Sequence, residues 1–116
     1  LHATYALGLA FLMDDQFDAA APLFAELLMP ARRAQLSRDR IRRSLTNLGE
    51  CQLKLQKYAA AEVSLHEAWE MSKQDVNARW PYFNVQRLLA TAMLKQKRYQ
   101  EAEPLLLEAH EGLVRG

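Results

Sequence analysis

One stretch decides the fold, Leu45-Thr46-Asn47-Leu48-Gly49, because its last two residues recur at a constant interval along the chain. The pair Leu48-Gly49 is preceded by Leu7-Gly8 and followed by Leu89-Ala90, and the two intervals are equal. That interval aligns further positions without a gap: Phe17, Tyr58 and Tyr99; Ala20, Ala61 and Ala102; Phe24, Leu65 and Leu106; Glu26, Glu67 and Glu108. A repeat of about 41 residues predicts an array of similar supersecondary units.

Each unit is predicted to contain two helices. In the second unit, apolar residues at helical spacing predict a first helix over residues 38–55, capped by Ser37, and a second helix over residues 58–72. Polar breaks separate the two helices of each unit, at residues 14–16, 56–57 and 96–98. We therefore predict a single all-α domain over residues 1–116, with six helices in three units. The units span residues 1–30, 38–73 and 78–115.

Prolines set two of the helix boundaries. Pro30 cannot continue a helix, so the second helix is predicted to end there. Pro81 is tolerated in the first turn of a helix, which places the start of the fifth helix just before it, with Asp75 or Asn77 as the cap.

Small residues in the repeat indicate close helix packing. Gly8, Gly49 and Ala90 stand mid-helix, where glycine costs roughly 1 kcal/mol relative to alanine. Because this cost is repeated at the same place, we expect the second helix of each pair to approach closely there. The aromatic residue at each turn is predicted to fill the wedge where the two helices meet.

Composition limits the classes of function. The chain has 116 residues, half of them hydrophobic, and a net charge of +1, so we expect no nucleic-acid partner, which would favour a strongly basic surface. No apolar run approaches the roughly 18 residues of a membrane span, and no basic leader is seen, so neither a membrane partner nor a signal peptide is expected. A single cysteine, Cys51, favours a cytoplasmic protein.

The aligned residues resemble the tetratricopeptide repeat, a helix-turn-helix family whose usual period is about 34 residues. With its longer period, this chain is similar to the longer subclass of kinesin light chains and of bacterial signalling proteins, including arrays attached to serine/threonine kinases. The likeness lies in residues 45–49 and in Arg98-Tyr99-Gln100-Glu101-Ala102-Glu103-Pro104-Leu105. It implies a short right-handed α-solenoid whose first helices line a concave groove that binds peptides.

The resemblance also implies which residues face that groove. The positions that we predict to bind a peptide are Tyr5, Leu9, Arg43, Asn47, Glu50, Lys54, Asn84, Arg87, Thr91 and Lys95. Further positions on the same helix faces are His2, Leu12, Thr46 and Leu88. A clamp for a carboxyl terminus, as in chaperone-binding members, is not predicted. The chain has Tyr5, Leu9 and Leu88 where polar residues are required, and the neutral Asn84 where a lysine is expected.

Two features of the groove positions point to a ligand. The amide of Asn47 offers a donor and an acceptor, which matches one peptide unit of an extended ligand, although a solvated polar residue is the plainer alternative. Arg43, Lys54, Arg87 and Lys95 would favour an acidic partner. Arg38, Arg40 and Arg42 add to a basic cluster at one helix start, which is either a binding feature or an ordinary solvated face.

No residue pattern supports catalysis, a cofactor or a metal. His66-Glu67-Ala68-Trp69-Glu70 lacks the second histidine of a metalloprotease helix, so an exposed helix face is expected. Cys51 aligns with Ala10 and Ala92 and is interpreted as a small core residue. Trp69 and Trp80 are expected to pack at junctions between units.

A protein-interaction module that binds a peptide segment is the favoured hypothesis of function. The alternative is a sensor, in which a closed, partly apolar pocket around Tyr5, Leu9 and Leu88 binds a small peptide or metabolite and the domain switches an attached signalling effector. An enzyme is not predicted. The helix register runs past Leu1, and Leu105-Leu106-Leu107 is apolar on several sides, so we expect a piece of a longer array or self-association through the terminal helices.

Overall fold

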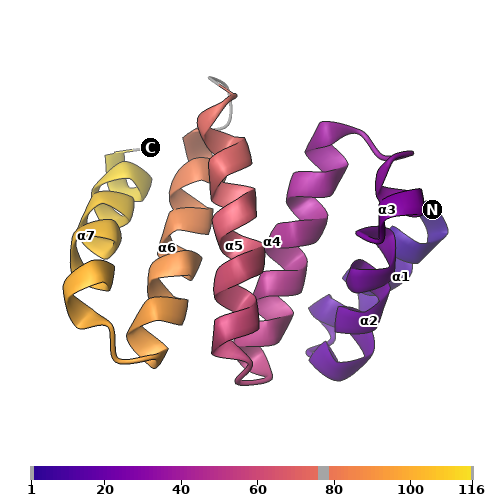
Figure 1. Cartoon of the computed structure of the whole chain (residues 1–116), viewed down its shortest axis with the longest axis horizontal. Coiled ribbons are helices and arrows are strands. Elements are labelled where there is room, and N and C mark those ends of the chain that lie inside the picture. Colours follow the sequence, from indigo (N-terminus) through magenta and orange to yellow (C-terminus); the bar gives the residue numbers. More distant parts are fainter. Residues whose placement is uncertain (1, 76–78, 116) are drawn as a thin grey trace.

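The computed structural model describes residues 2–75 and 79–115, and within them it contains seven α-helices (Figure 1). The helices are α1 His2–Met13, α2 Phe17–Leu27, α3 Pro30–Arg33, α4 Arg38–Lys54, α5 Tyr58–Lys73, α6 Arg79–Lys95 and α7 Tyr99–Arg115. The prediction of an all-α fold is confirmed. The prediction of six helices is wrong by one, because the segment between the first two pairs forms the short helix α3.

The helices pack as adjacent pairs in chain order. α1 packs on α2, α4 on α5 and α6 on α7, while α2 also packs on α4 and α5 on α6 (Figure 1). α4 additionally contacts α1 and α6, whereas no contact of the same extent joins α2 with α5 or α5 with α7 in the described residues. The first helices of the three pairs, α1, α4 and α6, therefore form one continuous layer.

The turn inside each pair has the same backbone geometry at the same place in the repeat. Asp15, Gln56 and Lys97 are equivalent positions of the three units, and each adopts a positive φ, of 58°, 64° and 64°. The amide that follows each of them donates to a carbonyl five positions earlier, as in Gln16 N to Phe11 O at 2.8 Å. This is the Schellman arrangement that ends many helices, although glycine usually occupies the left-handed position. The repeat seen in the sequence is thus present in the backbone.

Glycine allows the close helix approach that the repeat predicts. A Cβ atom added to Gly49 would lie 2.5 Å from Leu65 Cγ, and one added to Gly8 would lie 3.0 Å from the ring of Phe24. Leu65 and Phe24 are themselves fully buried and occupy equivalent places on α5 and α2. In the first two pairs, the second helix therefore fills the space that a side chain would need.

Two apolar clusters form the core. One joins α1, α2 and α4 around Phe24 and Leu27, and the other joins α4 to α7 around Leu65 and Leu89. The three equivalent alanines, Ala20, Ala61 and Ala102, are fully buried. The predicted wedge-filling role of the turn aromatics is confirmed for Phe17, which packs against the first cluster, whereas Tyr58 is half-buried but belongs to neither cluster. The prediction is wrong for the third unit, where Tyr99 is 56% exposed.

Helix ends follow local chemistry. Ser37 caps α4 as predicted, since its Oγ accepts a hydrogen bond from the amide of Arg40 at 3.1 Å. α2 ends at Leu27, before the predicted boundary at Pro30, because Pro30 instead occupies the first position of α3, where proline is tolerated. Pro81 lies in the first turn of α6 as expected. Asn77, one of the two predicted caps of α6, lies outside the described residues.

Ion pairs connect neighbouring units. The guanidinium of Arg33, at the end of α3, pairs with Glu67 on α5. Arg98, in the turn before α7, pairs with Glu62 on α5 at 2.6 Å and with Glu101 on α7 at 2.7 Å. The hydrogen bonds from Arg98 lower the pKa of Glu101. These contacts are exposed or half-exposed, so they set the register between units more than they add stability.

Candidate functional site

A first hollow lies over the layer formed by α1, α4 and α6. Its volume is about 530 Å³. Six of the predicted binding residues contribute to its wall; these are Tyr5, Leu9, Arg43, Asn47, Glu50 and Asn84. Tyr5 is held in place from two sides, because it packs edge-on against Phe24 and lies beneath the guanidinium of Arg40, 4.0 Å from the ring centroid.

A second hollow of about 370 Å³ lies along α4 and α6 and shares Glu50 with the first. The remaining predicted binding residues, Lys54, Arg87, Thr91 and Lys95, line it. The two hollows are hereafter called the inner surface. All ten predicted residues therefore meet on the inner surface, although they come from all three repeat units. That these residues bind a peptide stays a prediction.

Other groove positions divide into two groups. Thr46 lines the first hollow and Leu88 the second. His2 is exposed and Leu12 packs against the N-terminal core cluster, and neither is among the residues that line the inner surface. The pocket expected for a sensor is not formed as predicted, because Leu88 lies in a different hollow from Tyr5 and Leu9.

The structure adds residues that sequence reasoning did not place on the inner surface. Trp80 lines the first hollow and is 64% exposed, so the prediction that it packs at a junction is wrong. Trp69 does pack between units as predicted, with its ring centroid 5.6 Å from that of Tyr82. An exposed tryptophan beside a hollow offers a large apolar contact to a ligand.

Asn47 differs from Asn84 in its hydrogen bonding. Asn47 is half-buried, and its amide has no hydrogen-bond partner among the described residues. Asn84 Oδ1 accepts a hydrogen bond from Arg87 Nη2 at 2.9 Å, so part of its capacity is already used. Among the described residues that line the inner surface, Asn47 and Gln56 therefore have side-chain amides with both donor and acceptor open, and of these two Asn47 is the half-buried one.

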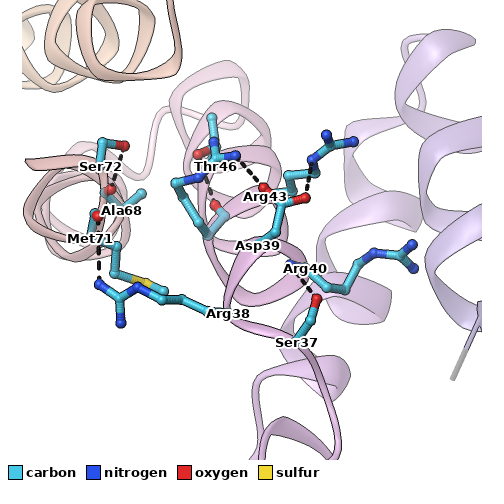
Figure 2. Close-up of polar contacts among 10 residues, drawn as sticks. Ser37, Arg38, Asp39, Arg40, Arg43, Thr46, Ala68, Met71 and Ser72 are labelled. Carbon is cyan, nitrogen blue, oxygen red and sulfur yellow. Dashed lines mark hydrogen bonds and ion pairs between the residues drawn. The ribbon is translucent and has the colours of Figure 1, made fainter. Parts of the chain in front are cut away.

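Most of the basic cluster at the start of α4 has partners within the chain. Arg42 and Arg43 both pair with Asp39, at 2.6 and 2.9 Å. Figure 2 shows Arg38 and Arg40 leaving the helix in opposite directions, with Arg38 reaching the carbonyl of Met71. Arg38 also donates to the side chain of Gln74, and Arg40 lies over the ring of Tyr5. Asp39, in the first turn, also offsets the repulsion between these cations and the helix dipole. Structural contacts thus account for much of the cluster.

The second hollow is lined by basic side chains that have no acidic partner in the described part of the chain. Lys54 and Lys95 have no ion pair within the described residues. Around both hollows, the described lining residues include five cations, Arg42, Arg43, Lys54, Arg87 and Lys95, against one anion, Glu50. Because Arg42 and Arg43 share Asp39, the least compensated positive charge lies in the second hollow.

The residues weighed for chemistry lie apart from the inner surface. His66 is exposed and lies 3.7 Å from Glu70 on the same face of α5, as the sequence predicts. Cys51 is fully buried among apolar residues, and this burial, together with the neighbouring Glu50, raises the pKa of its thiol to about 11. Within residues 2–75 and 79–115, no group of three or more histidine, cysteine or acidic residues is placed to hold a metal ion. In the same residues, no helix combines the length and apolarity that crossing a membrane requires.

Comparisons of this chain with protein-family models, with curated proteins and with solved structures give no match.

Proposed function

We propose that this chain is a protein-interaction module of the tetratricopeptide type, and that its inner surface binds an extended segment of a partner protein. The observation that carries the proposal is the open amide of Asn47, half-buried at the centre of a surface made by all three first helices. An amide that presents both a donor and an acceptor matches the backbone of an extended peptide.

Support for the repeat class comes from the backbone. The left-handed turn residues recur at the interval of the sequence repeat, and a second helix fills the space above the glycine of the first helix in two of the three units. Helix-turn-helix units that stack only on their neighbours produce extended binding surfaces. We infer the longer subclass of this family from the length of the repeat.

Charge favours an acidic partner. Lys54, Arg87 and Lys95 surround the second hollow with only Glu50 to oppose them among its described lining residues. An acidic segment would neutralise them and would be steered toward the surface at low ionic strength. The first hollow, with Trp80, Tyr5 and Leu9, would receive an apolar side chain of the same segment. A compact metabolite fits less well, because the apolar residues are divided between two hollows.

The test is selection of binding peptides from a random library, followed by fluorescence anisotropy with the best sequence. Selected peptides should be rich in acidic residues. Asn47→Ala should weaken binding about tenfold, since two neutral hydrogen bonds are together worth roughly 1–2 kcal/mol. Replacing both Lys54 and Lys95 by alanine should weaken binding further and flatten its dependence on salt.

Lys97→Ala is the matched control. Lys97 is an exposed lysine in the turn before α7, and it lines neither of the two hollows. It should bind like the unmodified chain. Equal affinity for the chain, for Asn47→Ala and for the double lysine variant would show that the peptide binds elsewhere. A ligand-induced rise in melting temperature with small metabolites, but not with any peptide, would favour the sensor that controls a signalling effector.

A further inference from the structure

The second hollow concentrates positive charge that the chain does not neutralise. Lys54, Arg87 and Lys95 line it, and none of them has an acidic partner among the described residues. Glu50 is the only acidic residue among the described residues of the lining, so the hollow carries a net charge of +2. Cations that lie close together without a counter-charge repel one another, and an anionic ligand relieves that repulsion.

Helix stability explains only part of this charge. Lys54 and Lys95 lie in the last turns of α4 and α6, where a cation interacts favourably with the helix dipole. Arg87 lies near the middle of α6, where the dipole gives no reason for a cation. Its equivalents in the two preceding units are Thr46 and Tyr5, so the repeat does not require a cation there either. Neither cause accounts for Arg87, which points to a ligand.

The charged residues of the hollow form two rows on neighbouring helices. Along α6, Arg87, Thr91 and Lys95 follow one another at four-residue intervals, which puts them on one face of the helix. Glu50 and Lys54 have the same spacing on α4, and α4 contacts α6 directly. Since arginine and lysine side chains are long and flexible, those on either side of Thr91 can converge on one anion.

The hollow also offers several hydrogen-bond donors without partners. Arg87 donates from Nη2 to Asn84 Oδ1, and its other guanidinium nitrogens have no partner among the described residues. The hydroxyl of Tyr58 is likewise without a hydrogen bond within the described part of the chain. Leu88, which is 7% exposed, lines the same hollow and lowers the local dielectric constant. Hydrogen bonds from charged donors are stronger in such surroundings.

A phosphoryl group matches this hollow better than a carboxylate does. A carboxylate brings one negative charge and two oxygens. A phosphorylated serine or threonine brings a charge of about −1.5 to −2 at neutral pH, with three acceptor oxygens. Lysine binds phosphate as a point charge, and arginine binds it through paired hydrogen bonds. One phosphoryl group would therefore balance the net charge of +2 that a single carboxylate leaves half-compensated.

We propose that the second hollow binds the phosphoryl group of a phosphorylated serine or threonine in the partner segment, held by Lys54, Arg87 and Lys95. The inference rests on the proposed function, because the segment is the one whose backbone Asn47 binds. Asn47 and Lys54 are seven positions apart on α4, about 10 Å along the helix axis. An extended peptide covers this distance in about three residues, which sets the place of the phosphorylated residue in the segment.

Fluorescence anisotropy with three forms of one peptide tests the proposal. The peptide is selected from a library with one fixed phosphoserine, and it is then synthesised with serine or glutamate in that place. The phosphoserine form should bind about tenfold more tightly than the glutamate form, and the serine form should bind most weakly. Equal affinity of the phosphoserine and glutamate forms would overturn this inference and leave the proposed function standing. If neither this library nor an unphosphorylated one yields a binding peptide, both fail.

Charge variants test whether the preference for phosphoserine arises in the second hollow. Arg87→Gln and the double variant Lys54→Gln/Lys95→Gln should each abolish that preference. Lys97→Gln is the matched control, since Lys97 is exposed and lines neither hollow, and it should keep the preference. Glu50→Gln removes the opposing charge and should strengthen binding of the phosphoserine form severalfold, a gain that misfolding cannot produce. A preference that survives in the arginine and lysine variants would contradict the assignment.

The pH dependence of binding reports the charge of the ligand. The second ionisation of a phosphorylated side chain has a pKa of about 6, so lowering the pH from about 7.5 to 5.5 should weaken binding of the phosphoserine form severalfold. Binding of the serine form should stay constant. The titratable residues among the described lining are Glu50, Lys54, Tyr58, Arg87 and Lys95, and none is a histidine. Parallel pH profiles for the phosphoserine and serine forms would contradict a dianionic ligand.

Competition with inorganic phosphate separates a site for a phosphorylated segment from a site for any small phosphate. Because the peptide also contacts Asn47 and the first hollow, inorganic phosphate should displace the phosphoserine form only at concentrations far above that of the peptide. Displacement at equal concentrations would show a simple anion site and would overturn the proposal.

Discussion

The close approach of α5 to Gly49 leads to a prediction with a worked magnitude. In Gly49→Ala, the new Cβ would lie 2.5 Å from Leu65 Cγ and 2.6 Å from Leu65 Cδ2, whereas ordinary contacts lie at 3.4–4 Å. Leu65 is fully buried, so we expect the helices to separate by about 1 Å, an overpacking strain of roughly 1–3 kcal/mol. Alanine regains about 1 kcal/mol of helix propensity. The net expectation is a loss of about 1 kcal/mol, or roughly 3–5 °C in melting temperature.

A double-mutant cycle separates the two contributions. Leu65→Ala alone should cost about 2–5 kcal/mol through the cavity that it leaves. In that background the clash is gone, so adding Gly49→Ala should stabilise the chain by about 1 kcal/mol. The sign of the Gly49→Ala effect should therefore reverse between the two backgrounds, with a coupling of roughly 1–3 kcal/mol.

Urea unfolding followed by circular dichroism gives the four free energies that the cycle needs. Gly8→Ala serves as a comparison, because its Cβ would meet Phe24 at 3.0 Å and should cost less than the change at Gly49. If Gly49→Ala stabilises the chain equally with and without Leu65, the glycine is not needed for close packing and the reasoning fails.

Three further predictions concern single residues. Ser37→Ala should lower the free energy of unfolding by about 1 kcal/mol in urea titrations, because it removes the cap of α4, whereas Ser37→Gly should cost only a few tenths. Gln86→Leu should raise the melting temperature, because the side chain of Gln86 is fully buried and has no hydrogen-bond partner among the described residues. The equivalent residue of the preceding unit is Leu45, so a leucine suits this place in the repeat. A lower melting temperature would mean that the amide of Gln86 stabilises the core. In the folded chain, the pKa of the Cys51 thiol is raised from 9.0 to about 11, so the folded state holds the thiol proton more tightly than the unfolded state. The contribution of this proton to the free energy of unfolding is complete below pH 9 and is lost as the pH rises toward 11. Unfolding in reducing buffer should therefore show the unmodified chain losing up to about 2 kcal/mol relative to Cys51→Ala over this range, and parallel pH profiles would contradict the assignment.

The helix pairs of the fold, which recur in every repeat unit, could be predicted from the sequence. Gly8 and Gly49 predict a close helix approach, because a glycine repeated in mid-helix indicates a packing requirement. That Leu65 fills the space above Gly49 was not predicted. α3 was missed, because a four-residue helix has too few positions to show a period, and Pro30 was interpreted only as an ending. The left-handed turn residues were also missed, since Gln56 and Lys97 are not the residue types that favour a positive φ.

The inner surface was predictable to the extent that it depends on the register. Asn47, Asn84 and Arg87 reach it because their places on the first helices are fixed by the repeat. Trp80 was not predicted there, since its exposure depends on where α6 begins and on which neighbours cover that turn. The arginines of α4 were the hardest to interpret, because a pair such as Arg42 with Asp39 depends on rotamers that no sequence pattern specifies.

Burial is uneven along the layer of first helices, and this sets how the molecule opens. α6 carries seven buried residues, among them Val85 and Leu89, whereas in α1 only Tyr5 and Gly8 are buried. Amide hydrogens of α1 should therefore exchange with solvent through local opening, while those of α6 should exchange only with global unfolding. Since Tyr5 contributes to the first hollow, a ligand held there would slow exchange in α1 first, and the least protected helix becomes the most sensitive reporter of binding.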